Sequence, residues 1–247
     1  MTYRTQLGTA KTKLRLRVRE IRCRAMQKLF LHKHRDAAPG TSEWLTLSEI
    51  QYGGYRTNIP IAKASPKDPQ KTGFLTGGDR MLAHGYAEKY SQHLMPYVQR
   101  GNSVVLIEVG VLQGSGLAIW CDLFRNSRII GLDVDLTHIE RNMDTLRKRG
   151  AFRYNHPELY EFDQLQDNTA FFKHLLGGGS IDIFIDDGAH YDEAIITTMK
   201  SSFHHLAHNF AYFIEDNRRV HSEISRLYPD LMVNNYGELT VVSPSRL

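Results

Sequence analysis

Short apolar runs alternate with helical segments after residue 100, and this alternation constrains the fold more than any other feature of the sequence. The apolar runs are rich in β-branched residues and end in glycine or acid: SVVLIEVG (103–110), RIIGLDVD (128–135), IDIFIDDG (181–188) and AYFIEDN (211–217). Strands that alternate with helices form a mostly parallel sheet covered on both faces, so the sequence predicts a doubly wound, Rossmann-like α/β domain. LMVNNYGELTVVSP (231–244) is expected to add an antiparallel pair.

Three regions are expected along the chain. Residues 101–247 form the sheet domain, residues 36–100 cover it and supply an acceptor site, and residues 1–35 form a basic helix. Residues 36–78 hold half of the eight prolines and show no sustained period, which indicates loops and short elements. A helix is predicted over residues 79–98.

A further helix is predicted over residues 191–209, where it would carry three histidines. His204 and His208 stand at the i, i+4 spacing of a zinc-binding pair, and His205 lies between them. No glutamate stands between the pair and no third ligand is evident, so we interpret these histidines as a solvated helix face.

The positive charge of the chain is concentrated at its start. Residues 1–35 contain eleven Lys and Arg residues and the single acid Glu20, a net charge of +10, whereas the whole chain carries +4. The remaining residues therefore carry −6, the difference between +4 and +10. This balance disfavours nucleic acid as a partner of the main domain.

The basic segment allows three interpretations. It predicts a helix that packs on its own domain or on a second subunit of a homo-oligomer, a helix whose residues 11–35 contact an anionic membrane, or an organellar transit peptide. The two cysteines stand in unrelated contexts, which favours a reducing compartment. No apolar run approaches the roughly 20 residues of a membrane span. We therefore expect a cytoplasmic protein, with peripheral membrane contact as an alternative.

A glycine-rich turn follows the first apolar run, in IEVGVLQGSG. Gly110, Gly114 and Gly116 allow a tight strand-to-helix turn that a ligand can approach closely. Their spacing differs from the G-x-G-x-x-G of dinucleotide-binding folds. Asp133 ends the second run, where such folds place a carboxylate that binds ribose hydroxyls. Glu108 would repel a phosphate but suits a cofactor with an ammonium or sulfonium group.

The order of these motifs resembles that of the class I S-adenosylmethionine-dependent methyltransferases. The resemblance rests on EVGVLQGSG, GLDVD, FDQLQD, IDDGAH and FIEDN, and on GGDRMLAHGYAEKY before them. More narrowly, the chain is similar to the metal-dependent sugar O-methyltransferases of macrolide biosynthesis, of the mycinamicin 6-O-methyltransferase type, and to the cephalosporin hydroxylase-like proteins. The match covers about residues 74–217, with Arg80 where the family usually has lysine. It implies S-adenosylmethionine as cofactor, with Asp163 and Gln164 near its adenine.

Three acids follow two of the predicted strands. Asp187 follows one strand, and Glu215 and Asp216 follow the next, so their carboxylates are expected to converge beside the cofactor crevice. Converging carboxylates favour a hard divalent cation, Mg²⁺ first among them. The resemblance places the same three residues on the family's metal ligands. Asp186 also lies at the end of its strand, and the sequence leaves open which aspartate faces the metal.

His190 is the expected general base, because it lies three residues after Asp187 and a histidine side chain has an intrinsic pKa of about 6.5. The catechol methyltransferases carry lysine at this offset, so histidine favours a sugar-type acceptor. His84, Tyr86 and Tyr90 stand at helical spacing and either line the acceptor site or pack the covering helix. The predicted function is therefore S-adenosylmethionine- and Mg²⁺-dependent methyl transfer to a hydroxyl of a sugar or glycosylated product. The alternatives are a catechol-type methyltransferase and a non-catalytic cofactor-fold protein recruited through its basic helix.

Overall fold

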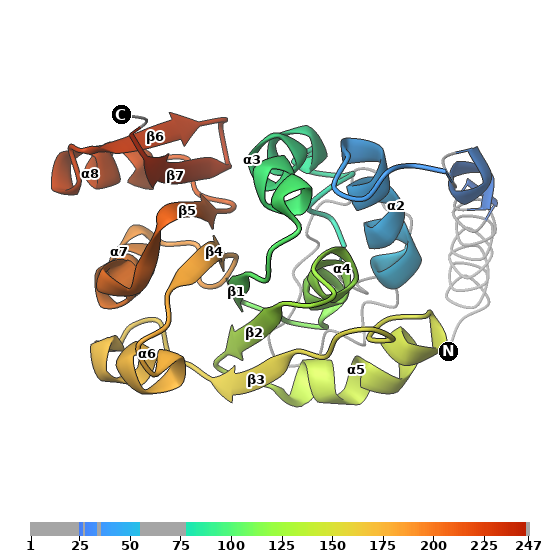
Figure 1. The fold of residues 1–247 in the computed structure, drawn as a ribbon, viewed down its shortest axis with the longest axis horizontal. Coiled ribbons are helices and arrows are strands. Elements are labelled where there is room, and N and C mark those ends of the chain that lie inside the picture. The colour runs from blue at the N-terminus through green and yellow to red at the C-terminus, as the bar shows by residue number, and fades with distance from the viewer. Residues whose placement is uncertain (1–24, 27, 34–35, 55–77, 246–247) are drawn as a thin grey trace, which may run out of the picture.

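The computed structural model describes residues 25–26, 28–33, 36–54 and 78–245 (Figure 1). Residues 28–33 are helical, as the basic pattern predicts, but residues 1–24 lie outside the described part. The predicted basic helix and its subunit or membrane contacts therefore remain predictions. In the described part of the chain, no helix combines the length and the apolar character needed to span a bilayer.

A seven-stranded sheet forms the centre of the molecule, in the order β3-β2-β1-β4-β5-β7-β6 (Figure 1). The first five strands along the chain pair in parallel, and β7 pairs antiparallel with both β5 and β6. The strands are β1 (Val105–Val109), β2 (Arg128–Asp133), β3 (Glu158–Glu161), β4 (Ile181–Asp186), β5 (Leu206–Ile214), β6 (Leu231–Asn235) and β7 (Thr240–Pro244). This order confirms the predicted doubly wound sheet and its final antiparallel pair.

Helices cover both faces of the sheet because successive strand residues point to opposite sides. Leu106 belongs to the core cluster under α2 (Ser42–Gly53), α3 (Ala87–Arg100), α4 (Ser115–Leu123) and α5 (Thr137–Lys148). Ile107 belongs to the cluster under α6 (Thr169–Leu176), α7 (Asp192–Ser202) and α8 (Val220–Leu227). Strand order reverses between β1 and β4, and open α/β sheets bind ligands at the carboxyl ends of strands at such a point.

Two predicted helix boundaries were wrong. The helix predicted over residues 191–209 ends at Ser202, and a 3₁₀ turn (Phe203–His205) leads into β5. His204 and His208 therefore do not share a helix, because pairing with β4 begins already at Leu206. The helix predicted from residue 79 begins at Ala87, and turns occupy much of the stretch before it.

The covering segment contains a regular helix that its proline content did not indicate. Helix α2 spans 12 residues and buries Leu45, Ile50 and Tyr52. Thr41 caps it, because its side chain accepts a hydrogen bond from the Trp44 N–H. The part of this segment over residues 55–77 lies outside the described residues, so the predicted acceptor site is only partly described.

Candidate functional site

The acidic residues at three neighbouring strand ends converge around one buried cation, Arg80. Its Nη2 donates to Glu108 Oε1 at 2.7 Å and to Asp187 Oδ2 at 2.8 Å. Its Nε lies 2.6 Å from Glu215 Oε1. Glu108 belongs to β1, whereas Asp187 and Glu215 directly follow β4 and β5. The structure therefore brings together acids that the sequence placed at separate strand ends.

One guanidinium cannot balance three carboxylates. Burial raises the pKa of Glu108, Asp187 and Glu215, and the Arg80 charge offsets part of that rise. The other oxygen of Glu108, Oε2, is buried and has no hydrogen-bond partner among the residues that the structure describes. The group carries a deficit of positive charge, which favours binding of a further cation or a proton.

The segment that precedes and begins α3 supplies further contacts to these acids. Tyr86 donates its hydroxyl to Asp216 Oδ1 at 2.9 Å, and Tyr90 donates its hydroxyl to Glu215 Oε1. His84 Nδ1 lies 3.6 Å from Asp216 Oδ1. The three residues expected at the acceptor site thus contact the acids that end β5, and their role toward an acceptor stays a prediction.

Asp187, His190 and Asp216 form a group that could hold a metal ion. One ligand atom from each of them lies within 4.8 Å of the others. His190 and Asp216 have left-handed φ angles of 62° and 56°, and His190 Nδ1 is buried with no hydrogen-bond partner in the described part of the chain. Such backbone conformations are costly for residues other than glycine and concentrate at functional sites. Glu215 is not part of this group, because it contacts Arg80 and Tyr90 instead.

The structure separates the two adjacent aspartates. Asp186 is buried and accepts a hydrogen bond from Gln164 Nε2 at 2.9 Å, whereas Asp187 faces Arg80. Burial raises the pKa of Asp186 to about 6. Gln164 also accepts the Ala189 N–H at 2.7 Å. Gln164 therefore positions the loop after β4, and its contact with adenine remains a prediction.

The glycine turn brings the backbone against these acids. Gly110 has a φ of 83°, and a Cβ there would lie 2.0 Å from the Asp187 carbonyl oxygen. A Cβ at Gly116 would lie 2.2 Å from Glu108 Oε1. Gly114, with a φ of 78°, precedes α4 at its N-cap. The packing of the site therefore requires glycine at Gly110 and Gly116 even without a bound ligand.

Asp133 and Asp163, the two remaining residues of the predicted cofactor site, accept hydrogen bonds from backbone N–H groups of nearby loops. Asp133 accepts the Leu112 N–H at 3.0 Å and the Asp135 N–H at 3.1 Å, which ties the glycine turn to the end of β2. Asp163 accepts the Leu165 N–H at 3.0 Å. Both lie at the carboxyl edge of the sheet, where the prediction placed the ribose and the adenine.

A pocket of about 60 Å³ opens beside the glycine turn. Its lining includes Glu49, Arg80, Glu108, Gly116 and Asp187. Sites for small molecules usually measure about 300–1,000 Å³, so the pocket can hold only part of a cofactor without rearrangement. Because the pocket lies where strand order reverses, it marks the expected binding crevice.

Sequence reasoning missed two buried ionisable residues at this site, Arg80 and Glu49. The sequence shows Arg80 only as a residue that stands where the family usually has lysine. Its position inside the motif GGDRMLAHGYAEKY is the one sequence feature that could have indicated a role at the site. Glu49 in α2 accepts the Met81 and Leu82 N–H groups at 2.8 and 2.9 Å. Burial raises the pKa of Glu49 to about 7. The sequence around Glu49 does not predict that this acid is buried, because its hydrogen-bond partners are backbone groups of a distant segment.

The sequence of this chain is similar to those of known O-methyltransferases. No family model matches the chain. It is 28% identical over 146 residues to an 8-demethyl-8-alpha-L-rhamnosyl tetracenomycin-C 2'-O-methyltransferase of Streptomyces olivaceus, a match that covers 57% of this chain and 35% of the relative. It is 29% identical over 143 residues to a mycinamicin VI 2''-O-methyltransferase of Micromonospora griseorubida, covering 54% of this chain and 31% of the relative. The chain thus spans about a third of the length of these relatives.

A solved structure supports the assignment of the fold. The O-methyltransferase TomG from Streptomyces achromogenes, solved in complex with SAM, superposes with a TM-score of 0.50 at 12% identity. The superposition covers 80% of this chain and 96% of TomG. The chain therefore has the Rossmann-like fold of the class I S-adenosylmethionine-dependent methyltransferases, and its sequence is similar to the sugar O-methyltransferases among them, as its motifs predicted.

Proposed function

We propose that this chain is an S-adenosylmethionine- and Mg²⁺-dependent O-methyltransferase whose acceptor is a sugar hydroxyl. The observation that carries the proposal is the convergence of Asp187, His190 and Asp216 beside a glycine turn, at the point where strand order reverses. The names of the two relatives, both O-methyltransferases of natural products, support the reaction and the glycosylated class of acceptor.

The cofactor would occupy the crevice between the glycine turn and the end of β2. Glu108 Oε2 lacks a partner and would bind the ammonium of the amino-acid end, while Asp133 would bind the ribose hydroxyls. Asp163 and Gln164 would lie toward the adenine. Because the pocket beside Glu108 measures about 60 Å³, binding requires side chains to move, and Arg80 lines that pocket.

The metal would be held by Asp187 and Asp216, whose oxygens lie within 4.8 Å of one another and of a His190 nitrogen. Glu215, the third expected ligand, contacts Arg80 at 2.6 Å and would join only if that contact opened. A divalent cation bound there would offset the carboxylate charge and would lower the pKa of an acceptor hydroxyl.

His190 would act as the general base. Among the described residues its Nδ1 has no hydrogen-bond partner, which leaves a ring nitrogen available to accept a proton. S-adenosylmethionine would supply the methyl group and keep the electron pair of the broken carbon–sulfur bond, and His190 would accept the hydroxyl proton. General-base assistance of this kind contributes about 10²–10⁴-fold, and alignment of oxygen, carbon and sulfur contributes further.

Calorimetric titration with S-adenosylmethionine, with and without Mg²⁺, tests the cofactor part of this proposal. We expect saturable binding at one site per chain, followed by methyl transfer to members of a panel of glycosylated natural products. A protein that does not bind the cofactor would be a scaffold, and turnover that persists in excess chelator would exclude the metal. Transfer to catechols alone would favour the catechol-type alternative.

A further inference from the structure

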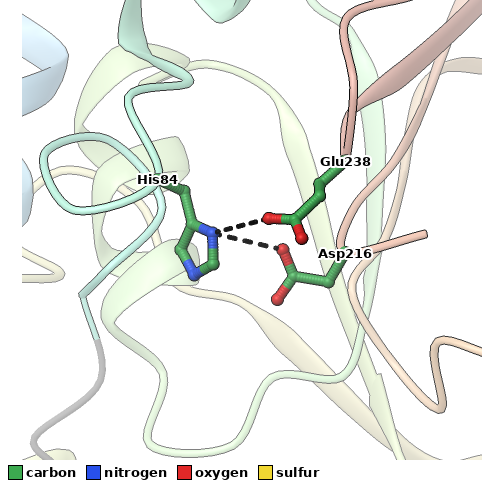
Figure 2. A group of neighbouring side chains, drawn as sticks. All are labelled: His84, Asp216 and Glu238. Atoms are coloured by element: carbon green, nitrogen blue, oxygen red, sulfur yellow. Dashed lines mark ion pairs between the residues drawn. The ribbon is translucent and has the colours of Figure 1, made fainter. Parts of the chain in front are cut away.

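A second group of possible metal ligands shares Asp216 with the first, and the proposed function assigns no metal to it. It consists of His84, Asp216 and Glu238, whose side chains point toward one another (Figure 2). His84 lies in the turns before α3, Asp216 follows β5, and Glu238 lies between β6 and β7. All three side chains are only partly exposed, at 22%, 24% and 39%.

The spacing within this group is too long for hydrogen bonds. His84 Nδ1 lies 3.6 Å from Asp216 Oδ1 and 3.7 Å from Glu238 Oε2, and both distances exceed the usual range for an N–H···O bond. Two ligands that share one ion with bonds of about 2.1 Å lie about 3.0–3.4 Å apart. Movement of a few tenths of an ångström would bring His84 Nδ1 to this spacing from each carboxylate oxygen, and the ligand atoms of all three residues lie within 4.8 Å of one another.

Neighbouring contacts orient the ligand atoms toward this common point. Arg218 donates to the other oxygen of Glu238, Oε1, at 2.9 Å, which leaves Oε2 facing His84. Tyr86 donates to Asp216 Oδ1 at 2.9 Å. The Asn217 N–H donates to the Glu238 carbonyl at 3.1 Å and fixes the hairpin turn beside β5. The group is thus supported by contacts that metal ligands in proteins commonly have.

We propose that His84, Asp216 and Glu238 form a second divalent-cation site, which takes a transition metal such as Zn²⁺ or Mn²⁺. An imidazole nitrogen among the ligands favours these ions over Mg²⁺, which prefers oxygen. Asp216 belongs to both groups, so its carboxylate would bridge the two sites. This proposal goes beyond the proposed function and does not depend on S-adenosylmethionine binding. The competing explanation is a protonated His84 that pairs with the two carboxylates without any metal.

Titration of the cofactor-free chain with ZnCl₂, followed by calorimetry, separates the two explanations. We expect the variants Glu238→Gln and His84→Gln to weaken one binding event by at least about tenfold, the loss typical of a removed ligand or its support. Glu223→Gln is the matched control, because that exposed carboxylate on α8 pairs with Arg226 at 3.4 Å and its loss should leave Zn²⁺ binding unchanged. Asp187→Asn should weaken the other site and keep this one.

The melting temperature is a second readout, and it distinguishes this site from weak Zn²⁺ binding by surface histidines. Zn²⁺ at this site would connect three distant parts of the chain, so it should raise the melting temperature of the wild-type chain more than that of Glu238→Gln. Zn²⁺ affinity and melting temperature that are the same in wild type, Glu238→Gln and His84→Gln would overturn the proposal. Loss of all Zn²⁺ binding in Asp187→Asn would also overturn it, because the group would then not bind independently.

Discussion

Replacement of Arg80 by methionine tests the central feature of the site, a single guanidinium among three carboxylates. Methionine fills similar apolar volume but has no charge, so Glu108, Asp187 and Glu215 would face one another without their cation. Arg80 is 7% exposed, and Glu108 and Glu215 are 1% and 2% exposed. Removal of one partner of a buried ion pair costs about 3–5 kcal/mol, and we expect Arg80→Met to lose that much free energy of unfolding.

The loss should depend on pH. Burial raises the pKa of these carboxyl groups, and Arg80 lowers it, so their folded-state pKa rises further once the guanidinium is gone. A folded state with raised carboxyl pKa binds more protons than the unfolded state, and its stability therefore falls as pH increases. Arg80→Met should be less destabilised at pH 5.5 than at pH 8.

Urea unfolding at the two pH values, followed by tryptophan fluorescence, measures both effects. Arg128→Met is a matched control, since its ion pair with Glu158 is partly exposed, at 34% and 39%. Such a pair contributes about 0–1 kcal/mol. Arg80→Lys, which keeps the charge, should fall between wild type and Arg80→Met. A loss below about 1 kcal/mol for Arg80→Met, or one that is equal at both pH values, would refute the reasoning.

Three further substitutions follow from the same geometry. His190→Ala should lower methyl transfer by about 10²–10⁴-fold while the calorimetric affinity for S-adenosylmethionine is kept, and full turnover would exclude the general base. Gly116→Ala places a Cβ 2.2 Å from Glu108 Oε1 and should lower stability by about 1–3 kcal/mol in urea unfolding; an unchanged midpoint would contradict the close packing. Glu49 has a pKa raised to about 7, so its contribution to stability is present at low pH and is lost as pH rises toward 7. Glu49→Gln should therefore flatten the decrease in unfolding free energy between pH 5 and pH 8, and an unaltered slope would count against a buried, protonated Glu49.

The sheet could be predicted because each strand can be recognised from the residues of its own short segment. The runs ending at Gly110, Asp133 and Gly188 are mostly apolar, which is typical of strands buried on both faces. The acids at the strand ends could be predicted as well, since parallel strands place their carboxyl ends at one edge. The choice between Asp186 and Asp187 could not be made, because it depends on which face of β4 meets Gln164.

The features that sequence reasoning missed depend on distant contacts. Arg80 reaches Glu108 and Asp187, which lie 28 and 107 residues away along the chain. Helix α2 was missed because its buried side includes Glu49, whose partners belong to the segment before α3. The end of α7 was misplaced because helical periodicity continues past Ser202, whereas pairing with β4 at Leu206 determines the structure.

The left-handed backbone at His190 and Asp216 has a consequence for engineering. At φ values of 62° and 56°, glycine would fit both positions more easily, by about 1 kcal/mol each. A selection for thermal stability alone would therefore tend to remove an imidazole and a carboxylate from the site. Stabilised versions of this chain are best sought elsewhere in the fold, with both positions held fixed and activity scored alongside melting temperature.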